Sequence, residues 1–237
     1  MTDDATAQPS FRDRARAAVE PLALVFGRLG LTPNALTLIG FAIAVIGAWL
    51  AATQSWLAAG IVVLFGAAFD MFDGALARAT NKASKLGAFM DSTFDRAGEA
   101  VVYVGLVAGL AVLAGVPSGT PWLIVGPLAA AGAMAAAFMV SYARAKSEGL
   151  GFTPGRGMAS VGLAPREVRT AILGFGLIAA GILVTSQVAD YPADVVPGPP
   201  AWWVVLAGAL GLIAVLATFT VIQRIVHVVR EAHRQEQ

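Results

Sequence analysis

Five carboxylates interrupt a stretch of sequence whose other residues are mostly apolar or small. They are Asp70, Asp73, Asp91, Asp95 and Glu99. A carboxylate at membrane depth is costly unless it is paired, solvated or bound to a metal ion. One explanation for the group is a cluster of ion pairs with the neighbouring basic residues Arg78, Lys82, Lys85 and Arg96. The other explanation is a metal site.

The spacing of the aspartates favours a metal site. Asp70 and Asp73 are three residues apart and share one face of a helix. Asp91 and Asp95 are four residues apart and share a face in the same way. The connection over residues 80–85 is short and polar, which makes the two helices antiparallel neighbours and lets the four carboxylates converge. Oxygen ligands suit Mg²⁺ or Mn²⁺ better than Zn²⁺, and two such ions commonly serve the displacement of a phosphoryl group.

The residues between the two aspartate pairs fit a substrate that carries phosphate. Gly74 follows Asp73 directly and lets a ligand approach the backbone closely. Arg78 lies one turn further along, where its guanidinium can form two parallel hydrogen bonds to phosphate oxygens. Gly87 lets the second helix approach the first. Together these positions indicate chemistry on a phosphate group.

The composition indicates that this chemistry takes place in a membrane. Of the 237 residues, 57% are hydrophobic and 13% are charged, and the mean hydropathy is +0.73. An ordinary soluble domain has about 25% charged residues. The composition argues against a soluble enzyme, a disordered chain and a protein that binds nucleic acid, so no nucleic-acid partner is expected. The absence of cysteine excludes disulfides and thiolate metal ligands.

Six segments are long and apolar enough to cross a bilayer core of about 30 Å as helices. The predicted spans cover residues 34–52, 56–78, 86–114, 122–147, 166–188 and 201–229. All 16 basic residues lie near the termini or around the second and fourth connections, a segregation that the net charge of +1 conceals. Basic residues collect on the cytoplasmic side. Both termini and the carboxylates are therefore predicted to face the cytoplasm, in the plasma (inner) membrane.

The remaining segments complete the predicted organisation. Residues 1–9 are expected to form a disordered tail, and residues 10–29 alternate basic and apolar positions like an amphipathic helix lying on the cytoplasmic leaflet. Residues 10–230 are predicted to form a single all-α integral membrane domain, followed by a cytoplasmic tail over 231–237. A cleaved signal peptide is disfavoured because the apolar run 21–27 is barely long enough and lacks a cleavage site.

Written with its spacing, the aspartate segment reads Asp70-x2-Asp73-Gly74-x2-Ala77-Arg78-x8-Gly87-x3-Asp91-x3-Asp95. Position for position, this motif resembles the signature of the CDP-alcohol phosphotransferases, also called CDP-alcohol phosphatidyltransferases. The resemblance extends to the six spans, to the amphipathic helix and to the entry of the first span at Thr32-Pro33-Asn34. In effect it covers residues 10–230.

The resemblance implies a reaction and a role for each residue. Members of this family use a hydroxyl group to displace CMP from a CDP-linked lipid or alcohol, with divalent metal ions. Asp95 would be the proton acceptor, and the ligands of two Mg²⁺ ions, or Mn²⁺, would be Asp70, Asp73, Asp91 and Asp95. The donor, CDP-diacylglycerol, would contact Asn34, Ala35, Leu36, Thr37, Gly74, Arg78 and Ser84. Family members are often homodimers, and a homodimer is expected here.

The acceptor is predicted from five basic residues around the fourth connection, which we call the basic collar. They are Arg144, Lys146, Arg156, Arg166 and Arg169. They have a plainer explanation, which is that they only orient the chain and bind the headgroups of membrane lipid. A collar of this density favours a phosphorylated polar acceptor. Within the family, this region resembles the phosphatidylinositol phosphate synthases, which join inositol 1-phosphate to CDP-diacylglycerol.

Two departures from those synthases leave other acceptors open. The basic pair runs Arg144 then Lys146, in the reverse order, and the fifth span begins Arg166-Glu167-Val168-Arg169 in place of Arg-Pro-Glu-Arg. Glycerol 3-phosphate, another polar alcohol, or an archaeal-type CDP-lipid donor stay as alternatives. A cation-coupled membrane transporter is a hypothesis from a different class. It is disfavoured because the acids lie at one membrane edge and the sequence shows no internal repeat.

Overall fold

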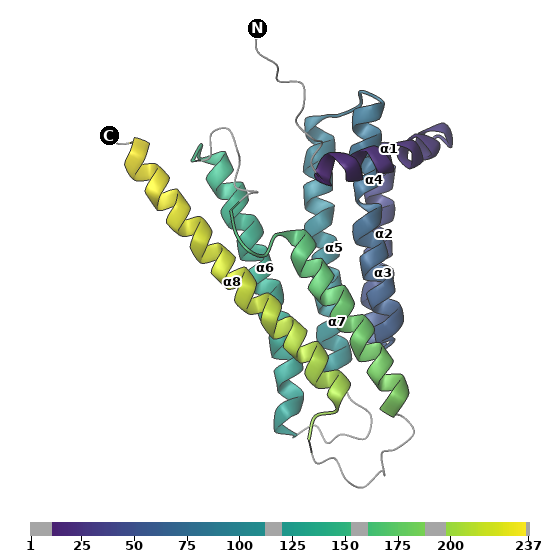
Figure 1. The fold of residues 1–237 in the computed structure, drawn as a ribbon, viewed down its shortest axis with the longest axis vertical. Helices are drawn as coiled ribbons and strands as arrows, with labels where there is room; N and C mark the ends of the chain where they lie inside the picture. The colour runs from purple at the N-terminus through teal and green to yellow at the C-terminus, as the bar shows by residue number, and fades with distance from the viewer. Residues whose placement is uncertain (1–10, 112–119, 153–160, 188–197, 236–237) are drawn as a thin grey trace. The chain divides into compact units, whose positions relative to one another are not determined.

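The computed structural model describes residues 11–111, 120–152, 161–187 and 198–235, which are all-helical and contain no strand (Figure 1). The first five helices are α1 (Phe11–Arg28), α2 (Pro33–Ala52), α3 (Trp56–Phe69), α4 (Met71–Ala79) and α5 (Lys85–Ala111). After them come the short 3₁₀ helix η1 (Pro121–Ile124), α6 (Val125–Gly149), α7 (Arg166–Gln187) and α8 (Ala201–Gln235). The predicted all-α class is confirmed for the described residues.

Five helical stretches in the described residues are long and apolar enough to cross a membrane. They are Pro33–Ala52, Trp56–Ala79, Trp122–Gly149, Arg166–Thr185 and Ala201–Gln235. Each matches one of the predicted spans. The remaining predicted span, 86–114, corresponds to α5, which carries charged residues in its first turns, and residues 112–114 lie outside the described part. A total of six spans stays a prediction.

Two predicted boundaries differ from the structure. The predicted span 56–78 is divided at Asp70, which separates α3 from α4. The interruption is local, because the Asp70 backbone N–H still donates to the carbonyl of Gly66 at 3.0 Å. The last helix continues to Gln235, beyond the predicted end at 229, since its final turns consist largely of residues that favour helix. The predicted tail at residues 1–9 lies outside the described residues.

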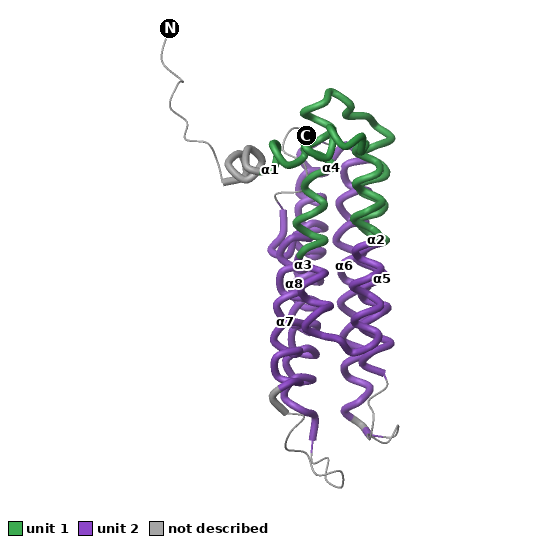
Figure 2. The backbone as a smooth tube through the Cα atoms, turned by 90° about the vertical axis from the view of Figure 1, so that its right-hand side faces the viewer, with its two compact units in different colours: residues 1–42, 65–97 green, residues 43–64, 98–237 purple. Residues whose placement is uncertain are grey.

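The chain divides into two compact units (Figure 2). Unit 1 comprises residues 1–42 and 65–97, and unit 2 comprises residues 43–64 and 98–237. Unit 1 therefore holds α1, α4 and one end of each of α2, α3 and α5. Unit 2 holds the other ends of those three helices together with α6, α7 and α8.

Unit 1 is organised around α1, which packs against α4. Phe26 of α1 contacts Phe69 and Phe72, with ring centroids 5.9 and 5.3 Å apart. Ala23 is fully buried on the same helix, whereas Leu22 is 56% exposed. The helix thus has one face against α4 and another apolar face that no described residue covers. This pattern agrees with the predicted amphipathic helix.

Unit 2 contains the main apolar core, in which α8 packs along α6 and α7. Fully buried core residues include Leu106, Leu110, Leu177, Leu206 and Ile213. Close packing of α5 on α2 depends on Gly105, since an added Cβ there would lie 2.2 Å from the carbonyl oxygen of Ala48. This small residue is therefore used for contact between two helices of the same chain.

Candidate functional site

The first aspartate pair lies where α3 gives way to α4 in unit 1. Asp73 is buried, with 7% of its surface exposed. One of its carboxylate oxygens accepts a hydrogen bond from the Thr37 hydroxyl at 2.6 Å, and the other accepts from the backbone N–H of Gly74. Because Thr37 belongs to α2, this contact joins the first span to the aspartate motif.

Asp70, the other member of this pair, also lies against α2. A Cβ added at Gly40 would lie 2.6 Å from an Asp70 carboxylate oxygen, so only glycine at that position leaves room for the side chain as it stands. Two sequence-predicted metal ligands, Asp70 and Asp73, therefore face residues of the first span within unit 1. The aspartate side chains are positioned by packing as well as by helical spacing.

The residues predicted to contact the donor lie in the same unit. Arg78 is exposed and its guanidinium folds back over Gly74, with an η nitrogen 3.2 Å from where a Cβ would be on that glycine. Ser84 caps α5, because its hydroxyl oxygen accepts the backbone N–H of Gly87 at 3.0 Å. The Asn34 side-chain oxygen also lies 3.5 Å from the Cβ position of Gly87. The start of α2 thus meets the start of α5.

The remaining predicted donor contacts, Ala35 and Leu36, follow Asn34 in the first turns of α2. The Ala35 backbone N–H donates to the Thr32 hydroxyl oxygen at 3.2 Å, so Thr32 begins the helix as its cap. Leu36 is almost fully buried, with 1% exposed. In this structure its side chain is part of the packing of unit 1, while the residues around it supply the polar groups.

The second aspartate pair lies on α5. Asp91 and Asp95 are both half-buried, and Asp95 forms an ion pair with the adjacent Arg96 at 3.8 Å. Unit 1 thus contains all four aspartates of the motif. Among the described residues, however, no group of three or more acidic or histidine side chains is arranged to hold a metal ion. The donor set of four carboxylates fits Mg²⁺ or Mn²⁺ chemically, and its convergence stays a prediction.

The basic collar belongs to unit 2, where its described members have different environments. Arg144 is exposed and pairs with Glu148 at 2.9 Å, one turn along α6. Lys146 is also exposed, and Arg166 is half-buried at the start of α7. Arg156 lies outside the described residues. The collar is therefore not a uniform solvated surface.

Arg169 is the buried member of the collar, with 1% exposed. Its guanidinium donates to both carboxylate oxygens of Glu99 on α5, the nearer at 2.9 Å, and to the carbonyl oxygen of Ala164 at 2.8 Å. A buried guanidinium with three such partners is fixed in orientation. Arg169 thus joins α5, α7 and the segment before α7.

Sequence reasoning missed Arg224 and Ser147 as members of this region. Arg224 of α8 is 4% exposed and donates to the backbone carbonyls of Val140 and Val161. The Ser147 hydroxyl is buried and has no hydrogen-bond partner in the described part of the chain. The only sequence signal was an arginine inside the apolar last span, where a charge is costly.

Comparison with known proteins gives a family match. The family model for CDP-alcohol phosphatidyltransferase matches residues 30–189. The archaetidylinositol phosphate synthase of Pyrococcus horikoshii is 35% identical over 162 residues, which are 68% of this chain and 77% of that protein. The phosphatidylinositol phosphate synthase of Corynebacterium glutamicum is 29% identical over 217 residues, 91% of this chain and 85% of that protein.

Solved structures of the phosphatidylinositol phosphate synthase of Mycobacterium tuberculosis are similar in fold. The structure with CDP-DAG bound aligns with a TM-score of 0.70 and 26% identity, covering 90% of this chain and 94% of that chain. The structure in complex with manganese and citrate aligns with a TM-score of 0.70 and 27% identity, covering 89% and 88%. The likeness therefore extends over nearly the whole of both chains.

Proposed function

This chain belongs to the CDP-alcohol phosphatidyltransferase family of transferases, and we propose that it moves a phosphatidyl group from CDP-diacylglycerol to inositol 1-phosphate. The products are phosphatidylinositol phosphate and CMP, so the reaction is a step of phospholipid biosynthesis. The proposal rests on the complete aspartate motif in unit 1, with Asp73 held by Thr37. The names of these relatives, which align with most of this chain, support the choice of acceptor.

The donor would bind in unit 1. The CDP group would contact the segment from Asn34 to Thr37, together with Gly74, Arg78 and Ser84. The four aspartates, Asp70, Asp73, Asp91 and Asp95, would hold two Mg²⁺ or Mn²⁺ ions, which supply positive charge beside the diphosphate when bound. The manganese complex of the M. tuberculosis relative supports metal dependence. Arg78 would add a guanidinium that binds phosphate oxygens.

The reaction would exchange one phosphate ester bond for another. The oxygen of the acceptor hydroxyl attacks the phosphorus atom that is bonded to the diacylglycerol oxygen. A new P–O bond forms to the acceptor, and the P–O bond between this phosphorus and CMP breaks. CMP leaves with the bridging oxygen, and the hydroxyl proton passes to the Asp95 carboxylate. Positioning of the two reactants and stabilisation of charge on the phosphate account for most of the catalysis in reactions of this type.

The acceptor phosphate would bind in unit 2 at the basic collar of Arg144, Lys146, Arg156, Arg166 and Arg169. We add Arg224 and Ser147 to this site. The guanidiniums of Arg169 and Arg224 are buried and oriented by backbone carbonyls, and the Ser147 hydroxyl is a buried donor with no described partner. A phosphate ion offers acceptors for all three groups.

We also propose the membrane arrangement. The chain would form one domain of six spans in the plasma membrane, with α1 on the cytoplasmic leaflet and both termini in the cytoplasm. The distribution of all 16 basic residues supports this orientation. The active site would then face the cytoplasm, where water-soluble inositol phosphate and the membrane-anchored donor can meet. A homodimer is proposed by analogy with the family.

An archaeal-type CDP-lipid is the second candidate donor, because the P. horikoshii relative is named archaetidylinositol phosphate synthase. Glycerol 3-phosphate is the alternative acceptor. Both alternatives keep the same chemistry, since they change the lipid chains or the alcohol and leave the displaced CMP and the aspartate motif unchanged. A panel of donors and acceptors separates them.

The test measures CMP release by the purified full-length protein with Mg²⁺ and CDP-diacylglycerol. Inositol 1-phosphate should support turnover, while free inositol, serine and glycerol 3-phosphate should not. Asp95→Asn should abolish turnover, and Glu20→Gln, an exposed carboxylate on α1, should not. Turnover that is greatest with glycerol 3-phosphate would overturn the acceptor, and an Asp95→Asn variant with full activity would remove the proposed base.

The collar has a separate test. Ala substitutions at Arg166 and Lys146 should raise KM for inositol 1-phosphate and leave KM for CDP-diacylglycerol unchanged. An unchanged acceptor KM in these variants would mean that the collar serves only to orient the protein in the membrane. These variants leave the aspartate motif unchanged, so the proposal for the acceptor can fail while the proposed reaction stands.

A further inference from the structure

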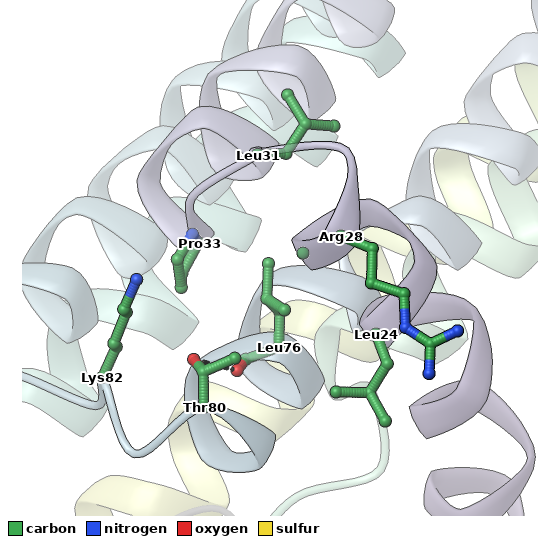
Figure 3. Close-up of a pocket in the computed structure, with 8 residues that line it drawn as sticks. Leu24, Arg28, Leu31, Pro33, Leu76, Thr80 and Lys82 are labelled. Atoms are coloured by element: carbon green, nitrogen blue, oxygen red, sulfur yellow. Dashed lines mark hydrogen bonds between the residues drawn. The ribbon is translucent and has the colours of Figure 1, made fainter.

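A pocket in unit 1 has no part in the proposed reaction. It lies where the end of α1, the start of α2 and the end of α4 meet, and its volume is about 220 Å³ (Figure 3). Three leucines supply its apolar walls: Leu24, Leu31 and Leu76. Thr80 and two basic residues, Arg28 and Lys82, complete the polar part of the lining. The pocket is therefore amphipathic.

Within the described part of the chain, no acidic side chain pairs with the cations of this pocket. The side chains of Arg28 and Lys82 are both exposed, and neither side chain forms an ion pair or hydrogen bond with a described residue. The lining contains no acidic side chain. Figure 3 shows the two basic residues on opposite sides of Leu76. Two cations beside an apolar surface are complementary to an anion that carries a hydrocarbon chain.

The way in which α1 and α4 end explains why these residues border the pocket. Gly30 and Asn81 follow the two helices with positive φ angles of 83° and 53°. The backbone N–H of the next residue donates a hydrogen bond to a carbonyl in the last turn of the helix. The distance is 3.1 Å for Leu31 after α1 and 2.8 Å for Lys82 after α4. Both closures satisfy helix carbonyls that would otherwise repel an anion.

The pocket also adjoins apolar surface that is exposed in the described part of the chain. On α1, Leu22 is 56% exposed and Val25 is 48% exposed, and Leu29, just after the helix, is 72% exposed. An amphipathic helix with such a face lies at the level of the lipid headgroups. From this charge pattern and placement we propose that the pocket binds the phosphate of an anionic membrane phospholipid, whose acyl chain starts along the leucines. This lipid is a bound ligand and not the substrate.

The test measures lipid binding directly, without turnover. Full-length protein in neutral detergent is titrated with phosphatidylglycerol, and bound lipid is counted by native mass spectrometry, with phosphatidylcholine and inorganic phosphate as separate arms. We expect one tight phosphatidylglycerol site and weak binding of the other two probes. Arg28→Ala with Lys82→Ala should weaken that site by about tenfold or more, since each basic residue near an anionic lipid contributes roughly 1 kcal/mol.

Two matched variants control this experiment. Arg230→Ala with Arg234→Ala removes two exposed cations from the end of α8 and should leave the site intact. Arg28→Lys with Lys82→Arg keeps the charge and should retain binding. Equal loss in the α8 variant, full binding in the alanine pair, or equal binding of phosphatidylcholine would each overturn the proposal.

A kinetic measurement separates this pocket from the donor site. In vesicles of phosphatidylcholine alone, the Arg28→Ala, Lys82→Ala variant should keep the KM for CDP-diacylglycerol of the unmodified protein. The proposal would be overturned if the KM of this variant for CDP-diacylglycerol rose by the same factor as its affinity for phosphatidylglycerol fell. The pocket would then be part of the donor site. Failure of CMP release by the unmodified protein would count only against the proposed reaction.

Discussion

Two side chains with similar chemistry differ sharply in what surrounds them. Arg144 and Arg169 each donate from a guanidinium to a glutamate at 2.9 Å. The Arg144 pair is exposed on α6, whereas the pair of Arg169 with Glu99 has 1% and 10% of its side chains exposed. An exposed ion pair contributes little, and a buried one is costly to break. Burial therefore decides which of the two is structurally important.

Arg169→Met should lower the free energy of unfolding by about 3–5 kcal/mol, because it removes one partner of a buried ion pair. Adding Glu99→Gln should recover much of that loss. Arg144→Met is the matched control and should cost less than about 1 kcal/mol. Denaturation of each variant in detergent checks this, and equal losses for the two arginine variants would contradict it.

Thr37 is the residue through which the first span reaches the aspartate motif. Thr37→Val keeps the shape of the side chain and removes the hydroxyl that donates to Asp73. A hydrogen bond to a charged group contributes roughly 1.5–3 kcal/mol, so kcat/KM for CDP-diacylglycerol should fall by about tenfold to a hundredfold.

Thr37→Ser, which retains the hydroxyl, should keep most of the activity. Initial rates of CMP release measure the effect, and a thermal unfolding profile checks that both variants are folded. Normal kinetics in Thr37→Val would show that the contact has no role in positioning Asp73.

At the scale of elements, the close approach of α5 to α2 in unit 2 is set by a backbone contact. Gly105→Ala should destabilise the protein by about 1–3 kcal/mol, since the new Cβ would collide with the carbonyl of Ala48 and the helices must separate. Gly132→Ala on α6 is the control, because an added Cβ there meets nothing within 4 Å.

Helix propensity alone favours alanine at both positions. Thermal unfolding in detergent should therefore show a lower Tm for Gly105→Ala and an equal or higher Tm for Gly132→Ala. If Gly105→Ala had the Tm of the unmodified protein, the contact with the Ala48 carbonyl would not limit how closely α5 approaches α2.

At the scale of the whole molecule, the distribution of basic residues along the chain predicts its orientation in the membrane. With a net charge of +1, the chain has no overall charge bias, yet its 16 basic residues are predicted to lie on one side of the membrane. The proposed orientation rests on the position of these residues, because basic residues collect in the loops on the cytoplasmic side. The predicted opposite side carries none of them.

Reporter fusions in bacteria test the proposed orientation. Alkaline phosphatase fused after Gln237 should be inactive, because that enzyme functions only outside the cytoplasm, and fused at Gly198, between α7 and α8, it should be active. A green fluorescent protein at the same two positions should give the opposite pattern. Phosphatase activity at the C-terminus would contradict the orientation.

The sequence by itself determined the class of fold and the family. Five of the six predicted spans correspond to helical stretches of membrane length in the structure, since long apolar runs have no alternative to helix in a bilayer. The aspartate motif identified the family because its fixed spacing survives in the linear sequence, and the family model confirmed it. These features are local, so no knowledge of packing was needed.

Only the tertiary structure decided which polar residues are buried and what they contact. From the sequence alone, Arg224 is interpreted as a basic residue that orients the last span. In the structure its guanidinium donates hydrogen bonds to the backbone carbonyls of Val140 and Val161. Thr37 meets Asp73 across 36 residues, and Arg169 meets Glu99 across 70. Such contacts depend on how helices approach one another, which is fixed by side-chain volumes at many positions together. No periodicity within a single helix carries that information.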